Sequence, residues 1–139
     1  MPKLTVAIPN YNGGDNLERC IESCKTIQIP ENDYEILIVD NKSTDNSISI
    51  VNEMKKKFTN IRLVENEKNL GRIQNWNVSI EKAHSKYLIF LFSNDLINEK
   101  NNIHELLQNL DSDQTISICI SALLKKEKSG QYIKKAYFD

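Results

Sequence analysis

The sequence lacks three features that would each restrict its function: a long apolar run, an excess of charge of one sign, and a paired cysteine pattern. No apolar run approaches the roughly 20 residues that a bilayer-spanning helix needs. The N-terminus, MPKLTVAIP, reads as a strand rather than as a signal peptide. Eighteen basic and nineteen acidic residues give a net charge of -1, which disfavours a general nucleic-acid binder. We therefore expect no transmembrane segment and no nucleic-acid partner.

The spacing of the cysteines and the absence of glycine-rich motifs are also informative. Cys20, Cys24 and Cys119 are odd in number and lack CxxC spacing. Because Cys20 and Cys24 lie four residues apart on one face of a predicted helix, buried free thiols explain them better than a metal site or a disulfide. Free thiols indicate a reducing, cytoplasmic setting. Neither GxGxxG nor GxxxxGK[ST] occurs, which disfavours dinucleotide-binding and P-loop sites.

The sequence does contain a regular alternation of apolar runs and amphipathic segments, in a composition (40% hydrophobic, 27% charged) typical of one soluble domain over residues 1–139. Strands are predicted at 3–9, 34–39, 61–64 and 87–92, and helices at about 17–28, 44–58, 72–84 and 101–110. Two further strands, 115–124 and 131–138, are predicted around a turn at 128–130. Asp15 with Glu18 resembles a capping box for the first helix, and Ser43 or Thr44 can cap the second.

This alternation predicts an α/β fold with a mostly parallel sheet and helices on both faces. Right-handed crossovers place the carboxyl ends of the four strands along one edge, where such folds bind ligands. The apolar run YLIFLF, residues 87–92, is expected to be the most buried strand. It leads directly into Ser93, Asn94 and Asp95, so these polar side chains should surface at that edge.

Four polar segments are predicted to meet there: Asn10-Tyr11-Asn12, Asp40-Asn41-Lys42-Ser43, Asn69-Leu70-Gly71-Arg72 and Ser93-Asn94-Asp95. Any one of them fits an ordinary loop, because Asn, Asp, Ser and Gly favour turns. Together they suit a nucleoside diphosphate. An aspartate accepts from a base or a ribose hydroxyl, and a cation held by a carboxylate screens the pyrophosphate.

The stretches KLTVAIPNYNGGDNLERCIES, YEILIVDNKSTDNS, RLVENEKNLGRIQNWN and KYLIFLFSNDLI occur in this order between residues 3 and 97. They resemble the nucleotide-binding half of family 2 inverting glycosyltransferases of GT-A fold. The resemblance implies transfer of a sugar from a nucleoside diphosphate donor, a UDP-sugar by family weight, to an unknown saccharide or lipid-linked acceptor with inversion. It also implies a role in polysaccharide biosynthesis, in the cytoplasm or at the cytoplasmic face of the membrane.

The resemblance also implies site residues, with Tyr11 beside the base, Asp40 accepting a hydrogen bond from it, and Arg72 meeting a phosphate. The implied nucleotide-binding set is Pro9, Asn10, Tyr11, Asn12, Asp40, Asn41, Ser43, Asn69, Gly71, Arg72, Asn77, Ser93 and Asn94. In the family's VDDGSTD segment, Asn41 and Lys42 replace the second Asp and the Gly. Trp76 is expected to be a core or helix-packing residue.

The Asp-X-Asp metal motif of the family is altered in this sequence. Phe92 occupies the place of the first Asp and Asn94 that of the metal-ligating Asp. The resemblance therefore implies Asn94 and Asp95 as ligands of Mn²⁺ or Mg²⁺, with Asp95 supplying the only negative charge. A neutral amide oxygen ligates either ion more weakly than a carboxylate does. A turn leading into the next helix is the alternative explanation of both residues.

No acidic residue of this sequence aligns with the general base of the family, so the catalytic residue is unknown. We expect these 139 residues to be a shortened form without the acceptor-binding half. An apolar face left uncovered could favour self-association. Two alternatives remain: a non-catalytic nucleotide-sugar-binding module with a degenerate metal site, and a flavodoxin-like signalling domain. The predicted terminal hairpin disfavours the second of these.

Overall fold

A computed structural model describes residues 1–115, 123–126 and 132–135 of the chain. Its contacts divide the chain into two compact units, Met1–Asn101 and Asn102–Asp139; the single domain expected over residues 1–139 stays a prediction. All four polar segments singled out in the sequence belong to the first unit.

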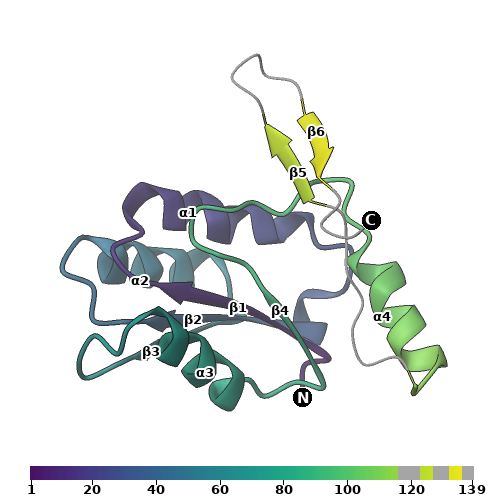
Figure 1. Ribbon diagram of the computed structural model, residues 1–139, viewed down its shortest axis with the longest axis horizontal. Helices are drawn as coiled ribbons and strands as arrows, with labels where there is room; N and C mark the ends of the chain where they lie inside the picture. Colours follow the sequence, from purple (N-terminus) through teal and green to yellow (C-terminus); the bar gives the residue numbers. More distant parts are fainter. Residues whose placement is uncertain (116–122, 127–131, 136–139) are drawn as a thin grey trace. The chain divides into compact units, whose positions relative to one another are not determined.

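The first unit is built on a four-stranded, fully parallel sheet with the strand order β3-β2-β1-β4 (Figure 1). Its strands are β1 (Leu4–Asn10), β2 (Tyr34–Asp40), β3 (Ile61–Glu65) and β4 (Tyr87–Phe90). Every residue of β1 and β2 is buried. Such near-continuous apolar runs are typical of parallel strands that are covered on both faces. The predicted parallel sheet is confirmed.

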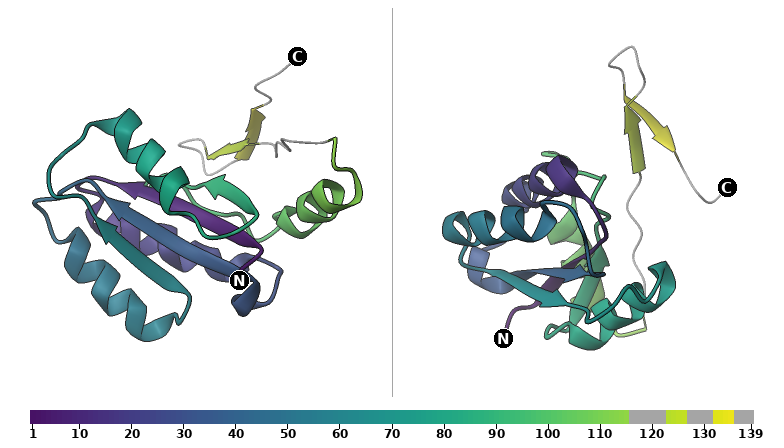
Figure 2. Two further views of the ribbon diagram at one scale, coloured as in Figure 1. Left: turned by 90° about the horizontal axis from the view of Figure 1, so that it is seen from below. Right: turned by 90° about the vertical axis from the view of Figure 1, so that its left-hand side faces the viewer.

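Helices cover both faces of this sheet, as predicted. Helices α1 (Gly14–Ser23) and α2 (Ser47–Lys57) pack against each other on one face, and α3 (Arg72–Lys82) contacts β1 and β2 from the other (Figures 1 and 2). Short 3₁₀ turns, η1 (Cys24–Thr26) and η2 (Glu31–Asp33), connect α1 to β2. The sheet therefore has its core on both sides.

The predicted buried thiols are confirmed for the two cysteines that the structure describes. Cys20 and Cys24 are buried free thiols on the inner side of α1 and η1. Burial raises the pKa of both, that of Cys24 to about 12. Both therefore act as small apolar core residues. Cys119 lies outside the described residues.

The capping box predicted for the first helix is wrong. Helix α1 begins at Gly14, so Asp15 lies inside its first turn instead of preceding it, and Gly13 makes no side-chain cap. The hydroxyl of Ser47, the first residue of α2, accepts from the backbone N–H groups of Gly13 (3.1 Å) and Gly14 (3.3 Å). A residue 33 or 34 positions away thus satisfies two backbone N–H groups at the start of α1.

The cap predicted for the second helix is also wrong. The residue before α2 is Asn46, which makes no side-chain cap hydrogen bond. The Ser43 hydroxyl is directed to Asp40 instead. Asp45 accepts from the backbone N–H of Ser47 at 3.0 Å. Hydrogen bonds from Ser47 lower the pKa of Asp45 although its slight burial opposes this.

Strand β4 is not the most buried strand. It covers only Tyr87–Phe90, and all four residues are half-buried because β4 lies at the edge of the described sheet, paired with β1 alone. After Leu91 the chain turns, and the backbone N–H of Asp95 donates to the carbonyl of Phe92 at 2.8 Å. The polar residues therefore follow an edge strand instead of a central one.

The second unit contains helix α4 (Ile103–Ser112) and an antiparallel hairpin of β5 (Leu123–Lys126) and β6 (Tyr132–Lys135). The helix predicted at 101–110 and the pairing of the last two strands are confirmed. The other parts of the predicted strands 115–124 and 131–138 lie mostly outside the described residues. Within the described ranges, no helix is long and apolar enough to cross a membrane.

Candidate functional site

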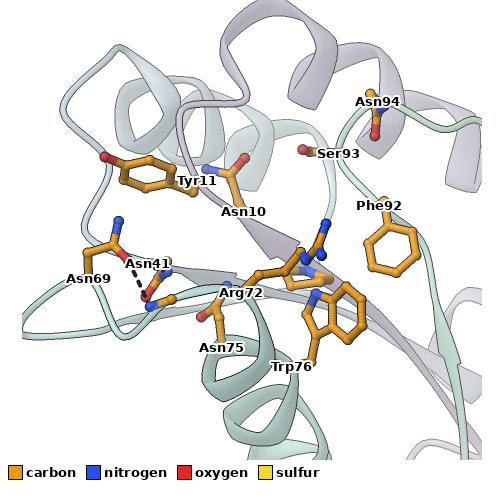
Figure 3. Close-up of a pocket in the computed structure, with 12 residues that line it drawn as sticks. Asn10, Tyr11, Asn41, Asn69, Arg72, Asn75, Trp76, Phe92, Ser93 and Asn94 are labelled. Atoms are coloured by element: carbon orange, nitrogen blue, oxygen red, sulfur yellow. Dashed lines mark hydrogen bonds between the residues drawn. The ribbon is translucent and has the colours of Figure 1, made fainter.

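A pocket with a volume of about 630 Å³ lies at the carboxyl ends of β1, β2 and β4 and beside the start of α3 (Figure 3). This volume lies within the range of small-molecule sites. All four polar segments contribute to it. The lining residues are Pro9, Asn10, Tyr11, Asn41, Asn69, Gly71, Arg72, Asn75, Trp76, Phe92, Ser93 and Asn94.

One wall of the pocket is a hydrogen-bonded network of asparagines. The amide nitrogen of Asn66, behind the wall, donates to Oδ1 of Asn41 (3.1 Å) and to Oδ1 of Asn75 (2.8 Å). Asn41 in turn donates to Oδ1 of Asn69 at 2.9 Å, and Asn75 to the carbonyl of Val39 at 3.0 Å. The backbone N–H groups of residues 70 and 71 donate to Asn41 and Asn69. The amide oxygens of this wall thus accept hydrogen bonds within the wall.

Asp40 lies behind the pocket and does not line it. Its side chain is only 2% exposed. Its Oδ1 accepts from the Asn10 amide (2.8 Å) and the Ser43 hydroxyl (2.5 Å), and its Oδ2 accepts from the Ser43 backbone N–H (2.8 Å). Both oxygens are therefore engaged within the protein. Asp40 and Ser43 support the wall from which Asn10 faces the pocket.

The carboxylate of Asp40 determines the orientation of the Asn10 amide. Because a carboxylate only accepts, the amide nitrogen of Asn10 must face Asp40 and its Oδ1 must face away. Within the described part of the chain this buried Oδ1 has no hydrogen-bond partner. A Cβ on Gly13 would overlap this Oδ1, and it would also crowd Ser93. Glycine at position 13 thus allows the Asn10 side chain to close this wall.

The opposite wall is aromatic. The Trp76 ring lies 5.2 Å from the Phe92 ring and 6.3 Å from the Phe90 ring, measured between centroids. The Arg72 guanidinium carbon lies 5.5 Å from the Trp76 centroid, in cation–π contact. Figure 3 shows Arg72 and Trp76 projecting from the same helix into the pocket. Trp76 packs on its neighbours as expected, and it also lines the pocket, which was not predicted.

Asn77 and Asp95, two of the predicted site residues, do not line the pocket. Asn77 is exposed on α3, and Asn75 lines the pocket in its place. Residues 72, 75 and 76 share a helix face because they are three and four positions apart, whereas residue 77 lies about 100° further round. That spacing was the signal in the sequence that could have identified Asn75 and Trp76.

The pocket does not offer a suitable ligand set for a divalent cation. Mg²⁺ and Mn²⁺ sites in proteins normally include at least one carboxylate. None of the twelve lining residues is acidic, and Asp95 is exposed outside them. Within residues 1–115 and the two described strands beyond them, no three His, Cys, Asp or Glu side chains form a candidate metal cluster. Asn94 alone of the predicted metal pair reaches the pocket.

Two curated relatives are transferases of sugars to a polymer. Over 96 residues the chain is 38% identical to the poly(ribitol-phosphate) beta-glucosyltransferase of Bacillus spizizenii, a match over 68% of this chain and 15% of that protein. Over 140 residues it is 30% identical to the poly(ribitol-phosphate) beta-N-acetylglucosaminyltransferase TarP of Staphylococcus aureus, a match over all of this chain and 42% of TarP. The chain thus spans less than half the length of either relative.

Solved structures resemble the fold. Staphylococcus aureus TarS 1–349 in complex with UDP-GlcNAc matches with a TM-score of 0.71 and 26% identity over 79% of this chain and 31% of that one. The mannosyltransferase PcManGT of Pyrobaculum calidifontis, in complex with GDP-Man and Mn²⁺, matches with a TM-score of 0.75 and 22% identity over 83% and 34%. The fold is therefore the GT-A fold that the resemblance implied.

The family model described as glycosyl transferase family 2 matches residues 5–137, which is nearly the whole chain. The relatives, the fold and the order of the polar segments agree with this match. The chain belongs to family 2 of the glycosyl transferases.

Proposed function

We propose that this chain binds the nucleoside diphosphate sugar donor of a sugar transferase, and that UDP is the nucleotide. The observation that carries the proposal is the convergence of segments around residues 10, 41, 70 and 93 on one pocket at the strand ends. A similar structure holds UDP-GlcNAc, and two relatives are named for transfer of glucose or N-acetylglucosamine to poly(ribitol phosphate). We propose these donors and this acceptor for the whole protein.

The pocket provides different surfaces for the parts of such a donor. Tyr11, half-exposed at the end of β1, offers a ring on which a pyrimidine can stack. The amides of Asn41 and Asn69 lie along the same side and can donate to base or ribose oxygens. Arg72 can meet the diphosphate with its planar set of N–H donors. Ser93 and Asn94, the other polar lining residues at the end of β4, can contact the sugar of the donor.

Transfer with inversion needs a general base opposite the leaving diphosphate, to take the proton of the acceptor hydroxyl. The lining residues include no carboxylate and no histidine, so we assign that step to none of them. Their part in the reaction is to hold the donor and to stabilise the charge that develops on the departing diphosphate.

Calorimetric titration with UDP, CDP, GDP and dTDP tests the nucleotide. We expect saturable binding at one site per chain, tightest for UDP. Because base–aromatic stacking contributes about 1–3 kcal/mol, Tyr11→Ala should weaken UDP binding by about 5- to 150-fold. The matched control is Asn77→Ala, which alters an exposed residue outside the pocket and should leave the affinity unchanged. Absence of binding by all four nucleotides would overturn the proposal.

A second candidate is a module that binds the donor without turnover. The absence of any acidic residue from the pocket lining favours it. Incubation with UDP-glucose or UDP-GlcNAc and poly(ribitol phosphate) separates the two functions. Release of UDP that depends on the polymer supports the transferase, and donor binding without such release supports the module.

A further inference from the structure

We propose that the pocket binds the donor's diphosphate through the guanidinium of Arg72, supported by Trp76 and Phe92, and without a divalent cation. This inference rests on the proposed function, because it presupposes that a nucleoside diphosphate occupies the pocket. It concerns the charge that compensates the diphosphate, for which the fold family otherwise suggests a metal ion.

The first ground is the charge of the lining. Arg72 is the only lining residue with a formal charge at neutral pH, and that charge is positive. A divalent cation would have to be held by neutral oxygens alone, since Asp95 lies outside the lining and both oxygens of Asp40 accept internal hydrogen bonds. A diphosphate entering this pocket meets a guanidinium directly, with no acidic group to repel it.

The second ground is the direction of the hydrogen bonds in the asparagine wall. The oxygens of Asn41, Asn69 and Asn75 each accept from other groups of the wall. A metal ion needs such oxygens to be available, whereas phosphate oxygens need N–H donors. Apart from the buried Oδ1 of Asn10, the amide oxygens of the wall already accept hydrogen bonds, so the groups that the wall can still offer a ligand are mainly amide N–H groups. This favours an acceptor-rich anion over a cation.

The third ground is the way Arg72 is held. Its guanidinium lies over the Trp76 ring, and Trp76 packs against Phe92, which stacks on Phe90 with the two ring planes 7° apart. Phe92 occupies the position at which the family resemblance places the first aspartate of the metal motif. The substitution that removes this carboxylate therefore also supplies the ring that supports the arginine. Trp76 and Phe92 are positioning residues in this scheme.

The test is titration of the protein with UDP in excess EDTA and, separately, in excess MnCl₂. The expected dissociation constants agree within about threefold, a difference well under 1.4 kcal/mol. Arg72→Gln should weaken binding by about 10- to 100-fold in both conditions, since it removes a charge-assisted contact. Arg72→Lys keeps the charge but loses the planar set of N–H donors. Its affinity for UDP should therefore lie between those of the original protein and of Arg72→Gln.

Two further variants test whether a loss of UDP affinity arises in the pocket or from the change of the protein's net charge. Lys68→Gln makes the same change of charge at an exposed residue of the preceding loop, outside the pocket, and should bind UDP like the unmodified protein. Trp76→Leu removes the ring beneath the guanidinium and should weaken binding by about tenfold at unchanged metal dependence, whereas Trp76→Phe should retain most of the affinity. Circular dichroism confirms that each variant is folded.

The outcomes are distinguishable. Binding that disappears in EDTA and returns with Mn²⁺ would overturn the metal-free scheme and leave the proposed function intact. Unchanged UDP affinity of folded Arg72→Gln would overturn the role of the arginine. Absence of UDP binding in both conditions would overturn the proposed function itself, and this inference with it.

Discussion

The side-chain amide nitrogen of Asn10 lies 2.8 Å from Oδ1 of Asp40, and this hydrogen bond joins the last residues of β1 and β2. The two residues are also partners in the strand register. Asp40 is 2% exposed and Asn10 is 1% exposed, so water competes little for this contact. The pair fixes the pocket wall from behind, although the sequence suggested that Asp40 itself would meet the base.

Asp40→Asn tests this supporting role. The variant places an amide NH₂ where the carboxylate now accepts from three donors, so at least one buried donor loses its partner. We expect the free energy of unfolding to fall by about 1–3 kcal/mol and UDP affinity to fall with it. Urea denaturation and calorimetry measure the two. A variant as stable as the original that no longer binds UDP would instead indicate direct contact between Asp40 and the nucleotide.

Glu35 lies at the opposite end of the sheet from the pocket, and its contacts predict a pH-dependent contribution to stability. It is 8% exposed, and it accepts from the Thr5 hydroxyl (2.6 Å), from Arg62 Nε (3.0 Å) and from the backbone N–H of His84 (3.0 Å). Burial alone would raise the pKa of Glu35, but these hydrogen bonds and the charge of Arg62 together lower it. We expect Glu35→Gln to cost about 1–3 kcal/mol of unfolding free energy at pH 7.

The pH dependence follows from the direction of that shift. A lowered pKa in the folded state means that the stabilising contribution of Glu35 is complete above the unfolded value, about 4.3. It is lost as the pH falls through the lower folded value. Urea denaturation from pH 7 to pH 3 measures the difference in unfolding free energy between the original protein and Glu35→Gln. We expect this difference to become smaller below about pH 4.3. Glu53→Gln, which breaks an exposed ion pair with Lys56, should change stability by no more than about 0.5 kcal/mol.

The sequence predicted the fold more fully than the site. Apolar runs and helical spacing are local patterns, and they located β1, β2, α3 and the sheet edge to within a few residues. The order of strands is not a local pattern, so β4 was expected to be the most buried strand, whereas it lies at the edge of the described sheet. Hydrogen bonds between residues distant in the chain are not local either. The sequence alone therefore could not tell that Asn66 orients the pocket amides while Asp40 is enclosed behind them.

Lys42 adopts a backbone conformation that normally favours glycine. Its φ is +64°, in the left-handed region that costs residues with a Cβ about 1–2 kcal/mol. This explains why the family pattern has glycine at the position. We expect Lys42→Gly to raise the free energy of unfolding by about 1 kcal/mol, seen as a higher urea midpoint with an unchanged slope. Lys42→Ala keeps the Cβ and should give no such gain. An equal gain in Lys42→Ala would show that the lost charge, and not the backbone conformation, causes the effect.

Asn66 is expected to control the pocket without lining it. Its amide nitrogen donates to the oxygens of both Asn41 and Asn75, and its side chain is buried. Asn66→Asp replaces this donor with a carboxylate that faces two oxygens, so both pocket amides should reorient. We expect a loss of about 2–3 kcal/mol in the free energy of unfolding and weaker UDP binding in the variant that remains folded. Asn52→Asp makes the same chemical change on the exposed side of α2 and should alter stability by no more than about 0.5 kcal/mol. If Asn66→Asp behaved like this control, the asparagine wall would not depend on Asn66, and the donor-rich character of the pocket would lose its structural basis.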